Sequence, residues 1–220
     1  MSEPKFNPKM LSAKEKLLER FRAQAAAEHE AEEWRRLPPG QHLTSGFPVL
    51  DLGVRPAIDL ERWTLEVTGE VEKPLRLNWK EFRDLPRVQQ VSDFHCVTTW
   101  SKYDVRWSGV PFRAVAERVG LKPTARFVVA QGGEGYTTNI PLADCMREDV
   151  ILADELDGAP LPLEHGGPVR LIVPHLYAWK SAKFLVALRF VESDEPGFWE
   201  VRGYHNYGDP WREQRYQGRG

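Results

Sequence analysis

From residue 60 onward, the apolar residues of this chain recur at the spacing of β-strands. Trp63, Leu65 and Val67 alternate with polar residues, and a period of two predicts a strand with one buried face. No apolar run approaches the ~18 residues that a membrane-spanning helix requires. The chain is therefore expected to form a strand-rich globular fold that does not enter a membrane.

Short helices are expected between the strands. One begins after Asn78, a second runs from Pro111 to Gly120 with proline at its start and glycine at its end, and a third covers 142–147. The glycine-rich segment 131–135 predicts a tight turn. The further expected strands are 88–96, 125–130, 136–140, 150–155, 169–173 and 184–191. This order predicts an α+β fold, a strand-rich mixed α/β single domain.

The N-terminal part has a different pattern. Residues 1–10 are polar and contain two prolines, and Ser12 and Glu15 have the spacing of a capping box at the start of a helix over 13–36. We therefore expect an N-terminal tail and helical extension over 1–40 and one domain over 41–220. The first residues do not resemble a secretory signal, so we expect a cytoplasmic protein.

Charge and cysteine content exclude several classes of function. Lys and Arg number 30 against 32 Asp and Glu, a net charge of -2, which argues against a nucleic-acid-binding protein held by broad phosphate neutralisation. Two cysteines are too few for a disulfide-rich scaffold or a cysteine-dominated zinc site.

Cys96 is a candidate for chemistry because it lies at the end of an expected strand that changes from apolar to polar, within Asp93-Phe-His-Cys-Val-Thr-Thr-Trp-Ser101. The alternative is a small buried hydrophobic residue, as most free cysteines are. His95 should point to the opposite face of the strand and is not automatically a partner base. Cys145 lies in no motif and is expected to pack in the core.

Two segments describe an anion-binding pocket. In 163–170, paired glycines permit close approach of a ligand to the backbone, and Arg170 offers a forked donor to a phosphate. In 177–183, lysines, a serine and loop amides add further donors beside aromatic side chains. The alternative is that these cations only extend from strand ends into solvent.

The order and spacing of several motifs resemble the molybdenum-cofactor domain of the sulfite oxidase family. The likeness runs from about residue 46 to 216, and the most similar branch is the compact one that includes the catalytic subunit of methionine-sulfoxide reductase. The motifs are Gly46-Phe-Pro-Val-Leu50, Phe94-His-Cys-Val-Thr-Thr-Trp100, Trp107-Ser-Gly-Val-Pro111, Asp149-Val-Ile-Leu-Ala153 with Leu161-Pro-Leu, His165-Gly-Gly-Pro-Val-Arg170 and Trp179-Lys-Ser-Ala-Lys183.

The resemblance implies roles for individual residues. Cys96 matches the cysteine that binds molybdenum, and a soft thiolate suits a soft, redox-active metal. Arg170 matches the arginine that holds the pterin phosphate, and His165 occupies a position where the reductase branch has Asn. The remaining cofactor-binding matches are the phosphate loop of Ser181, Ala182 and Lys183, and the segment of Phe47, Pro48 and Val49 on the other side of the pterin.

The implied function is oxygen-atom transfer to or from a small sulfite- or sulfoxide-like substrate by a molybdenum–molybdopterin cofactor. Sulfite oxidases follow the ligand cysteine with a small residue, Gly-Asn and paired arginines, whereas this chain has Val97-Thr-Thr-Trp-Ser101, so sulfite itself is not favoured. We expect no haem domain, and we expect a monomer that exchanges electrons with a separate partner.

Two other functions remain open from the residues alone. One is a pterin- or nucleotide-binding module without catalysis, which an Arg170 and Lys183 pocket would permit. The other is a hydrolase with Cys96 as nucleophile and His165 or His175 as base. Trp100, Tyr177 and Trp179 either form the substrate entrance or pack as core aromatic residues.

Overall fold

The computed structural model describes residues 16, 19–20, 35–50, 53 and 55–218. The chain divides into two compact units, 1–37 and 38–220. In the first unit, the described residues Lys16, Glu19, Arg20 and Arg35 are helical. Most of the helix predicted over 13–36, with its capping box, lies outside the described residues. No helix in the described part of the chain is long and apolar enough to span a membrane.

The second unit is built mainly of strands, as predicted. The strands of its described residues are β1 (His42–Leu43), β2 (Thr64–Gly69), β3 (Leu75–Asn78), β4 (Val88–His95), β5 (Trp100–Pro111), β6 (Phe127–Gly132), β7 (Thr137–Pro141), β8 (Ile151–Leu156), β9 (Ala159–Pro160), β10 (Arg170–Ile172) and β11 (Leu185–Val191). The helices are α2 (Trp79–Arg83), α3 (Phe112–Val119) and α4 (Leu142–Cys145), with the 3₁₀ turns η1 (Leu163–His165), η2 (Ala178–Lys180), η3 (Glu200–Arg202) and η4 (Pro210–Arg212).

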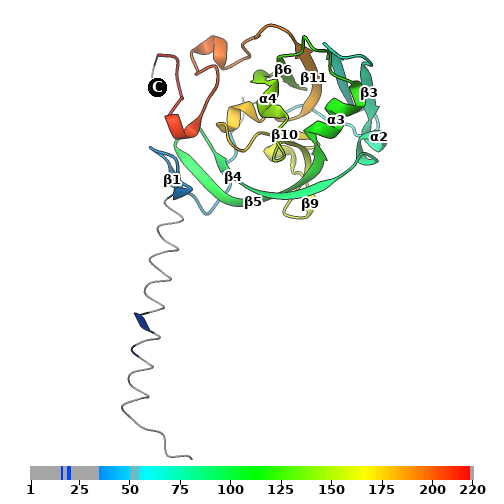
Figure 1. Cartoon of the computed structure of the whole chain (residues 1–220). Helices are drawn as coiled ribbons and strands as arrows, with labels where there is room; N and C mark the ends of the chain where they lie inside the picture. The colour runs from blue at the N-terminus through cyan, green and yellow to red at the C-terminus, as the bar shows by residue number, and fades with distance from the viewer. Residues whose placement is uncertain (1–15, 17–18, 21–34, 51–52, 54, 219–220) are drawn as a thin grey trace, which may run out of the picture. The chain divides into compact units, whose positions relative to one another are not determined.

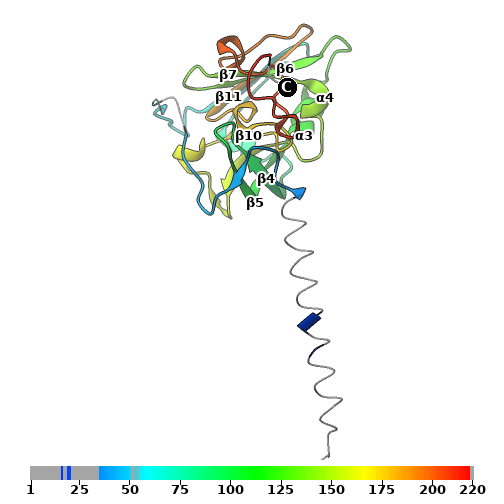
Figure 2. The same cartoon turned by 90° about the vertical axis from the view of Figure 1, so that its left-hand side faces the viewer.

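These strands form two sheets within the described residues. The first follows the order β1-β5-β8-β10, with β4 also paired to β5 and β9 to β8. The second follows the order β3-β2-β11-β6-β7. The pairs β1–β5 and β2–β11 are parallel, and the other pairs are antiparallel. Figures 1 and 2 show the long β4–β5 hairpin on one side of this unit and β6 and β11 on the other.

Local sequence signals account for the predicted elements. Asn78 caps α2, because its side chain accepts a hydrogen bond from the Glu81 amide while Glu81 accepts from the Asn78 amide. Helix α3 follows Pro111 and ends at Gly120, whose φ of +65° suits glycine. The strand predicted from residue 184 begins one residue later, because Phe184 has a φ of +51°.

At β8 the first sheet is buried on both faces. Leu152 on β8 packs in a core that also contains Leu65 and Leu188 of the second sheet. Its neighbour Ile151 points to the opposite face and packs in a second core, together with Trp107. Cys96 and its surroundings belong to this second core, so the candidate site is built on a sheet that is supported from behind.

Candidate active site

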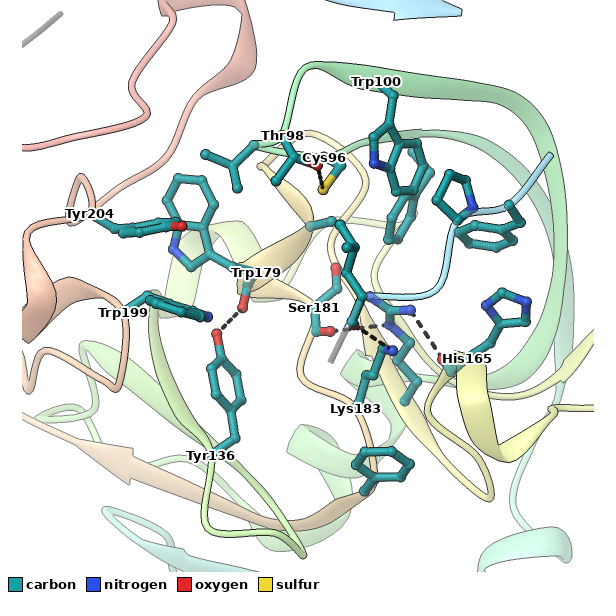
Figure 3. A pocket seen from close by; sticks show the side chains of 18 of the residues that line it. Cys96, Thr98, Trp100, Tyr136, His165, Trp179, Ser181, Lys183, Trp199 and Tyr204 are labelled. Carbon is teal, nitrogen blue, oxygen red and sulfur yellow. Dashed lines mark hydrogen bonds between the residues drawn. The ribbon is translucent and has the colours of Figure 1, made fainter. Parts of the chain in front are cut away.

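The turn between β4 and β5 holds Cys96. The Cys96 amide donates to the Trp100 carbonyl (2.9 Å), and the Thr99 amide donates to the Cys96 carbonyl (3.2 Å). Cys96 is 7% exposed, and its Sγ lies 3.1 Å from Thr98 Oγ1. Figure 3 shows this sulfur and hydroxyl at one end of a cavity. The sulfur therefore combines burial with a polar neighbour, unlike a cysteine that only packs.

Arg170 begins β10 and is 4% exposed. Its Nε donates to the Ser181 carbonyl (3.1 Å), and its Nη1 donates to the His165 carbonyl (3.1 Å). No described residue accepts a hydrogen bond from Nη2, and no described carboxylate pairs with this guanidinium. Burial lowers the pKa of Arg170 to about 10, which leaves it charged at neutral pH. A buried cation without an anionic partner is suited to binding an anion.

Lys183 joins two segments beside Arg170. Its Nζ donates to the carbonyls of Leu50 and Glu164, both at 2.8 Å. A side chain at Gly166 would have no room, because a Cβ there would lie 2.7 Å from Lys183 Cγ. The paired glycines predicted to permit close approach of a ligand therefore let the chain pack closely on itself, Gly166 against Lys183 and Gly167 against the Leu161 carbonyl.

His165 stacks on Phe47 at the same end of the site, with ring centroids 4.5 Å apart. Burial lowers the pKa of His165, and the positive charges of Arg170 and Lys183 lower it further. The imidazole is therefore neutral near pH 7 and can donate through one nitrogen and accept through the other.

One cavity of about 310 Å³ joins these groups, and Figure 3 shows it with Cys96, His165 and Lys183 around it. Seven of the nine predicted cofactor-binding residues line it, whereas Val49 is 39% exposed and Ala182 is buried at 1% exposure, and neither lines it. The lining residues are Phe47, Pro48, Leu50, Phe94, Cys96, Val97, Thr98, Trp100, Glu134, Tyr136, His165, Arg170, Ala178, Trp179, Ser181, Lys183, Phe184, Trp199 and Tyr204.

Aromatic side chains form the other wall of the cavity. Trp179 and Tyr204 meet edge to face with centroids 5.2 Å apart, and Trp199 stacks on Tyr204 at 4.8 Å. Trp100 also lines the cavity, but Tyr177 is fully buried and stacks behind Trp179. Of the three aromatic residues proposed for the entrance, Tyr177 is therefore a packing residue.

Trp179 is held in place by buried polar contacts. Its indole nitrogen donates to Glu200 Oε1 (2.9 Å), and its carbonyl accepts from the Tyr136 hydroxyl (2.5 Å). Glu200 Oε1 also lies 2.6 Å from Lys180 Nζ, and both side chains are completely buried. The indole N–H is thus occupied, and the ring presents only its carbon surface to the cavity.

Glu134 was not expected in the site. It belongs to the glycine-rich segment, which the sequence identified only as a turn, and β6 extends into that segment as far as Gly132. Its Oε2 atom is buried and receives no hydrogen bond from a described residue. Burial raises the pKa of Glu134, although Lys183 acts in the opposite direction.

The contacts of the sulfur do not favour a cysteine hydrolase. In the described part of the chain, Thr98 is the hydrogen-bond partner of Cys96 Sγ, and no imidazole bonds to it. His175 Nε2 lies 2.9 Å from Asp144 Oδ1 instead. Cys145 is completely buried, which raises the pKa of its thiol, as expected for a packing cysteine.

The side chains of the site suit a metal that is bound mainly by a cofactor, and not one that is bound by protein ligands alone. The described residues contain no cluster of three or more His, Cys, Asp or Glu side chains that could bind a metal ion. A single sulfur lies on the same cavity as a buried guanidinium without an anion. A group with its own metal ligands and a terminal phosphate fits these two features.

Known proteins are similar to this chain over most of its length. The family model described as the oxidoreductase molybdopterin binding domain matches residues 52–199. The uncharacterized oxidoreductase YuiH of Bacillus subtilis is 45% identical over 182 residues, which cover 82% of this chain and 92% of YuiH.

More distant relatives are longer than this chain. The protein-methionine-sulfoxide reductase catalytic subunit MsrP of Xanthomonas axonopodis is 32% identical over 69% of this chain and 52% of its own length. The crystal structure of the sulfane dehydrogenase SoxCD from Paracoccus pantotrophus matches with a TM-score of 0.60 and 21% identity, over 68% of this chain and 42% of that one. The chain thus spans about half of MsrP, and the SoxCD match supports the fold alone.

Proposed function

Because this chain belongs to the family of oxidoreductases with a molybdopterin-binding domain, we propose that it transfers an oxygen atom to or from a small sulfite- or sulfoxide-like substrate, with Cys96 as the protein ligand of molybdenum. The observation that carries this proposal is the placement of Cys96 and Arg170 on one cavity. When bound, the cofactor supplies the redox-active metal and the dithiolene sulfurs.

The cationic end of the cavity is suited to the phosphate of the cofactor. Arg170 directs its remaining Nη2 donor to this phosphate, while Nε and Nη1 stay bound to the chain. Lys183 adds positive charge, and His165 and Phe47 provide stacked rings beside the pterin. Ser181 belongs to this end as well, because its carbonyl fixes the orientation of the guanidinium.

The aromatic wall favours an uncharged substrate. Among the side chains lining the cavity, the permanent cations are Arg170 and Lys183, and the proposal assigns both to the cofactor. Trp179 and Tyr204 exclude water but offer no positive charge to an oxyanion. A sulfoxide-like substrate is therefore better matched than sulfite.

The electrons for this reaction come from, or go to, a separate protein in our proposal. Converting an oxide to its reduced form and water takes up two electrons and two protons. The name of MsrP describes it as a catalytic subunit, which supports a partner for this chain too. The cytoplasmic location and the monomeric state remain proposals from the sequence.

Metal analysis tests the function directly. We expect about one molybdenum per chain and a visible absorption band that a reductant bleaches, both lost when the protein is made in cells without molybdopterin synthesis. Cys96→Ser should remain folded but lose the band and nearly all turnover, because the metal loses its protein ligand.

Cys145→Ser is the matched control, since it removes the packing cysteine. Full turnover by Cys96→Ser would contradict the proposal. Absence of molybdenum from freshly purified wild-type protein would favour a binding module, and labelling of Cys96 by an electrophilic ester would favour a hydrolase.

A further inference from the structure

Two segments that lie outside the residues matched by the family model donate hydrogen bonds to the turn that carries Cys96. Gln41 Nε2 donates to the Cys96 carbonyl (2.9 Å), and Arg215 Nη1 donates to the Val97 carbonyl (2.6 Å). Gln41 precedes the matched residues 52–199, and Arg215 follows them. In Figure 1 the C-terminal segment, in red, lies at the end of the β4–β5 hairpin. The turn at Cys96 is therefore hydrogen-bonded to segments from both ends of the second unit.

Arg215 contacts several parts of the chain at once. Its Nη2 lies 3.4 Å from the Pro39 carbonyl and 3.3 Å from the Gly40 carbonyl. Its guanidinium carbon lies 5.0 Å from the centre of the Tyr177 ring, and no described carboxylate forms an ion pair with it. The guanidinium is therefore committed to backbone carbonyls, a role that its forked donors suit and an ammonium group does not.

The segment that carries Arg215 is itself attached to the cavity wall. The His205 amide donates to the Arg215 carbonyl (3.1 Å), and Tyr216 packs against the cavity residue Tyr204 with ring centroids 5.3 Å apart. This segment thus connects the aromatic wall to the turn at Cys96.

We propose that Arg215 is a positioning residue that holds the turn of residues 96–99 so that Cys96 Sγ faces the cavity. Thr99 in this turn has a φ of +72°, an unfavourable conformation for a β-branched residue, so neighbouring contacts must maintain it. Outer contacts of this kind orient metal ligands. For the loaded enzyme, the inference rests on the proposed function.

The first test measures cysteine reactivity and does not need the cofactor. Full-length chain made without molybdopterin synthesis is treated with iodoacetamide, and the two cysteines are followed by peptide mass. In Arg215→Ala we expect Cys96 to react about tenfold faster. The loss of a charge-assisted hydrogen bond lets the turn open more often, and the open turn exposes the thiol. Arg215→Lys should show a smaller increase, and the exposed neighbour Arg212→Ala should match the wild type.

Cys145 reports on the fold in the same experiment, because its side chain is completely buried. Faster labelling of Cys96 alone supports the proposal. If both cysteines react faster in Arg215→Ala, that variant has lost its fold, and the labelling of the milder Arg215→Lys variant is used instead. Faster labelling of Cys96 alone in Arg215→Lys then supports the proposal. Equal Cys96 rates in the wild type and in every folded Arg215 variant would overturn the proposal.

The second test uses the molybdenum-loaded protein. We expect Arg215→Ala to broaden or shift the Mo(V) electron paramagnetic resonance signal and to lower kcat more than it raises KM, with Arg215→Lys partly restoring both. An unchanged signal and an unchanged kcat would count against a positioning role. If no variant, including the wild type, contains molybdenum, the proposed function fails, while the cysteine labelling still tests Arg215.

Discussion

The two buried cations near the cavity differ in how their charge is compensated. Lys180 Nζ lies 2.6 Å from Glu200 Oε1, so its charge is paired within the fold. Among the described residues, Arg170 donates hydrogen bonds to the carbonyls of Ser181 and His165, its guanidinium lies over the Phe94 ring, and no carboxylate pairs with it. Because burial of an unpaired charge is costly, this difference supports the proposal that Arg170 binds the phosphate of the cofactor.

Replacing Arg170 should therefore weaken cofactor retention. Arg170→Gln removes the charge, whereas Arg170→Lys keeps it without the forked donors. A hydrogen bond to a charged group contributes about 1.5–3 kcal/mol, so we expect Arg170→Gln to bind the cofactor about 10- to 100-fold more weakly, with Arg170→Lys between. Molybdenum and pterin per chain after dialysis measure this. Arg189→Gln, which removes an exposed ion pair with Glu195, is the control.

His165 should make stability depend on pH. Its pKa in the fold is lower than in the unfolded chain, chiefly because of burial, so at a pH between these two pKa values the unfolded chain binds more protons than the folded chain. Stability is then present above the unfolded pKa of about 6.5 and is lost as pH falls through the folded pKa.

His165→Asn should remove this contribution. Urea unfolding of the cofactor-free chain between pH 8 and 5.5 should therefore show a steeper loss of stability in the wild type than in the variant. Parallel curves would exclude His165 as the cause, because the other titrating groups are common to both proteins.

Residue types identified much of the candidate site, but not all of it. Cys96 and Arg170 were recognisable because few side chains provide a soft ligand or a forked cation. Glu134 and Tyr204 were not, since a turn glutamate or a C-terminal tyrosine is usually exposed, and only the long-range fold brings them to the cavity. Thr98 became relevant only through its 3.1 Å contact with Cys96 Sγ.

Among the elements, β5 shows where periodicity fails. It runs from Trp100 to Pro111 and is central to the first sheet, yet the sequence did not predict it. Asp104 interrupts the strand with a φ of +54°, and the pairing shifts between Ser108 and Gly109. Glycine is typical of turns, but Gly109 lies within this strand, where it lets β5 pass close to β8. A Cβ at this position would lie 2.1 Å from the Leu152 carbonyl oxygen. Irregularities of this kind break the alternation that identifies a strand.

The buried ion pair between η2 and η3 should contribute to the stability of the fold. Lys180 of η2 and Glu200 of η3 are both completely buried, and Glu200 also accepts from Trp179. Glu200→Gln leaves the ammonium group without its counter-charge, so we expect a loss of about 3–5 kcal/mol of unfolding free energy, the usual cost of breaking a buried pair. Urea denaturation measures it, and Glu195→Gln at the surface should change stability by less than about 1 kcal/mol.

A double-mutant cycle separates the pair from each residue's other contacts. Lys180→Met with Glu200→Gln should cost less than the sum of the two single changes, because the double variant contains no unpaired buried charge. Strict additivity would mean that the two side chains do not stabilise each other.

At the scale of the molecule, the α+β class followed from sequence patterns, but the arrangement of the sheets did not. β2 was identified by the alternation of Trp63, Leu65 and Val67, which are 0–5% exposed. Its parallel pairing with β11 joins segments far apart in the chain. Local periodicity shows that a strand has a buried face, but not which strand it pairs with. The two-sheet framework around the cavity was therefore visible only in the structure.

Segments that are far apart in the sequence line the proposed cofactor site, so cofactor binding should stabilise the whole second unit. The cavity is lined by Phe47, which precedes the residues matched by the family model, by Cys96 from the β4–β5 turn, by Arg170 from β10, and by Tyr204 from the C-terminal segment. A ligand that binds only the folded state adds about 2.7 kcal/mol when it is present at 100 times its Kd.

At about 2–4 °C per kcal/mol for a chain of this size, the Tm of loaded protein should exceed that of cofactor-free protein by roughly 5–10 °C. Calorimetry on full-length chain from cells with and without molybdopterin synthesis measures the difference. Cys96→Ser should show a smaller increase, because the phosphate end still binds while the metal end does not, and Arg170→Gln should also show a smaller one. If loading leaves Tm unchanged although molybdenum is present, the cofactor is not held between these segments, and the cavity has been assigned to the wrong ligand.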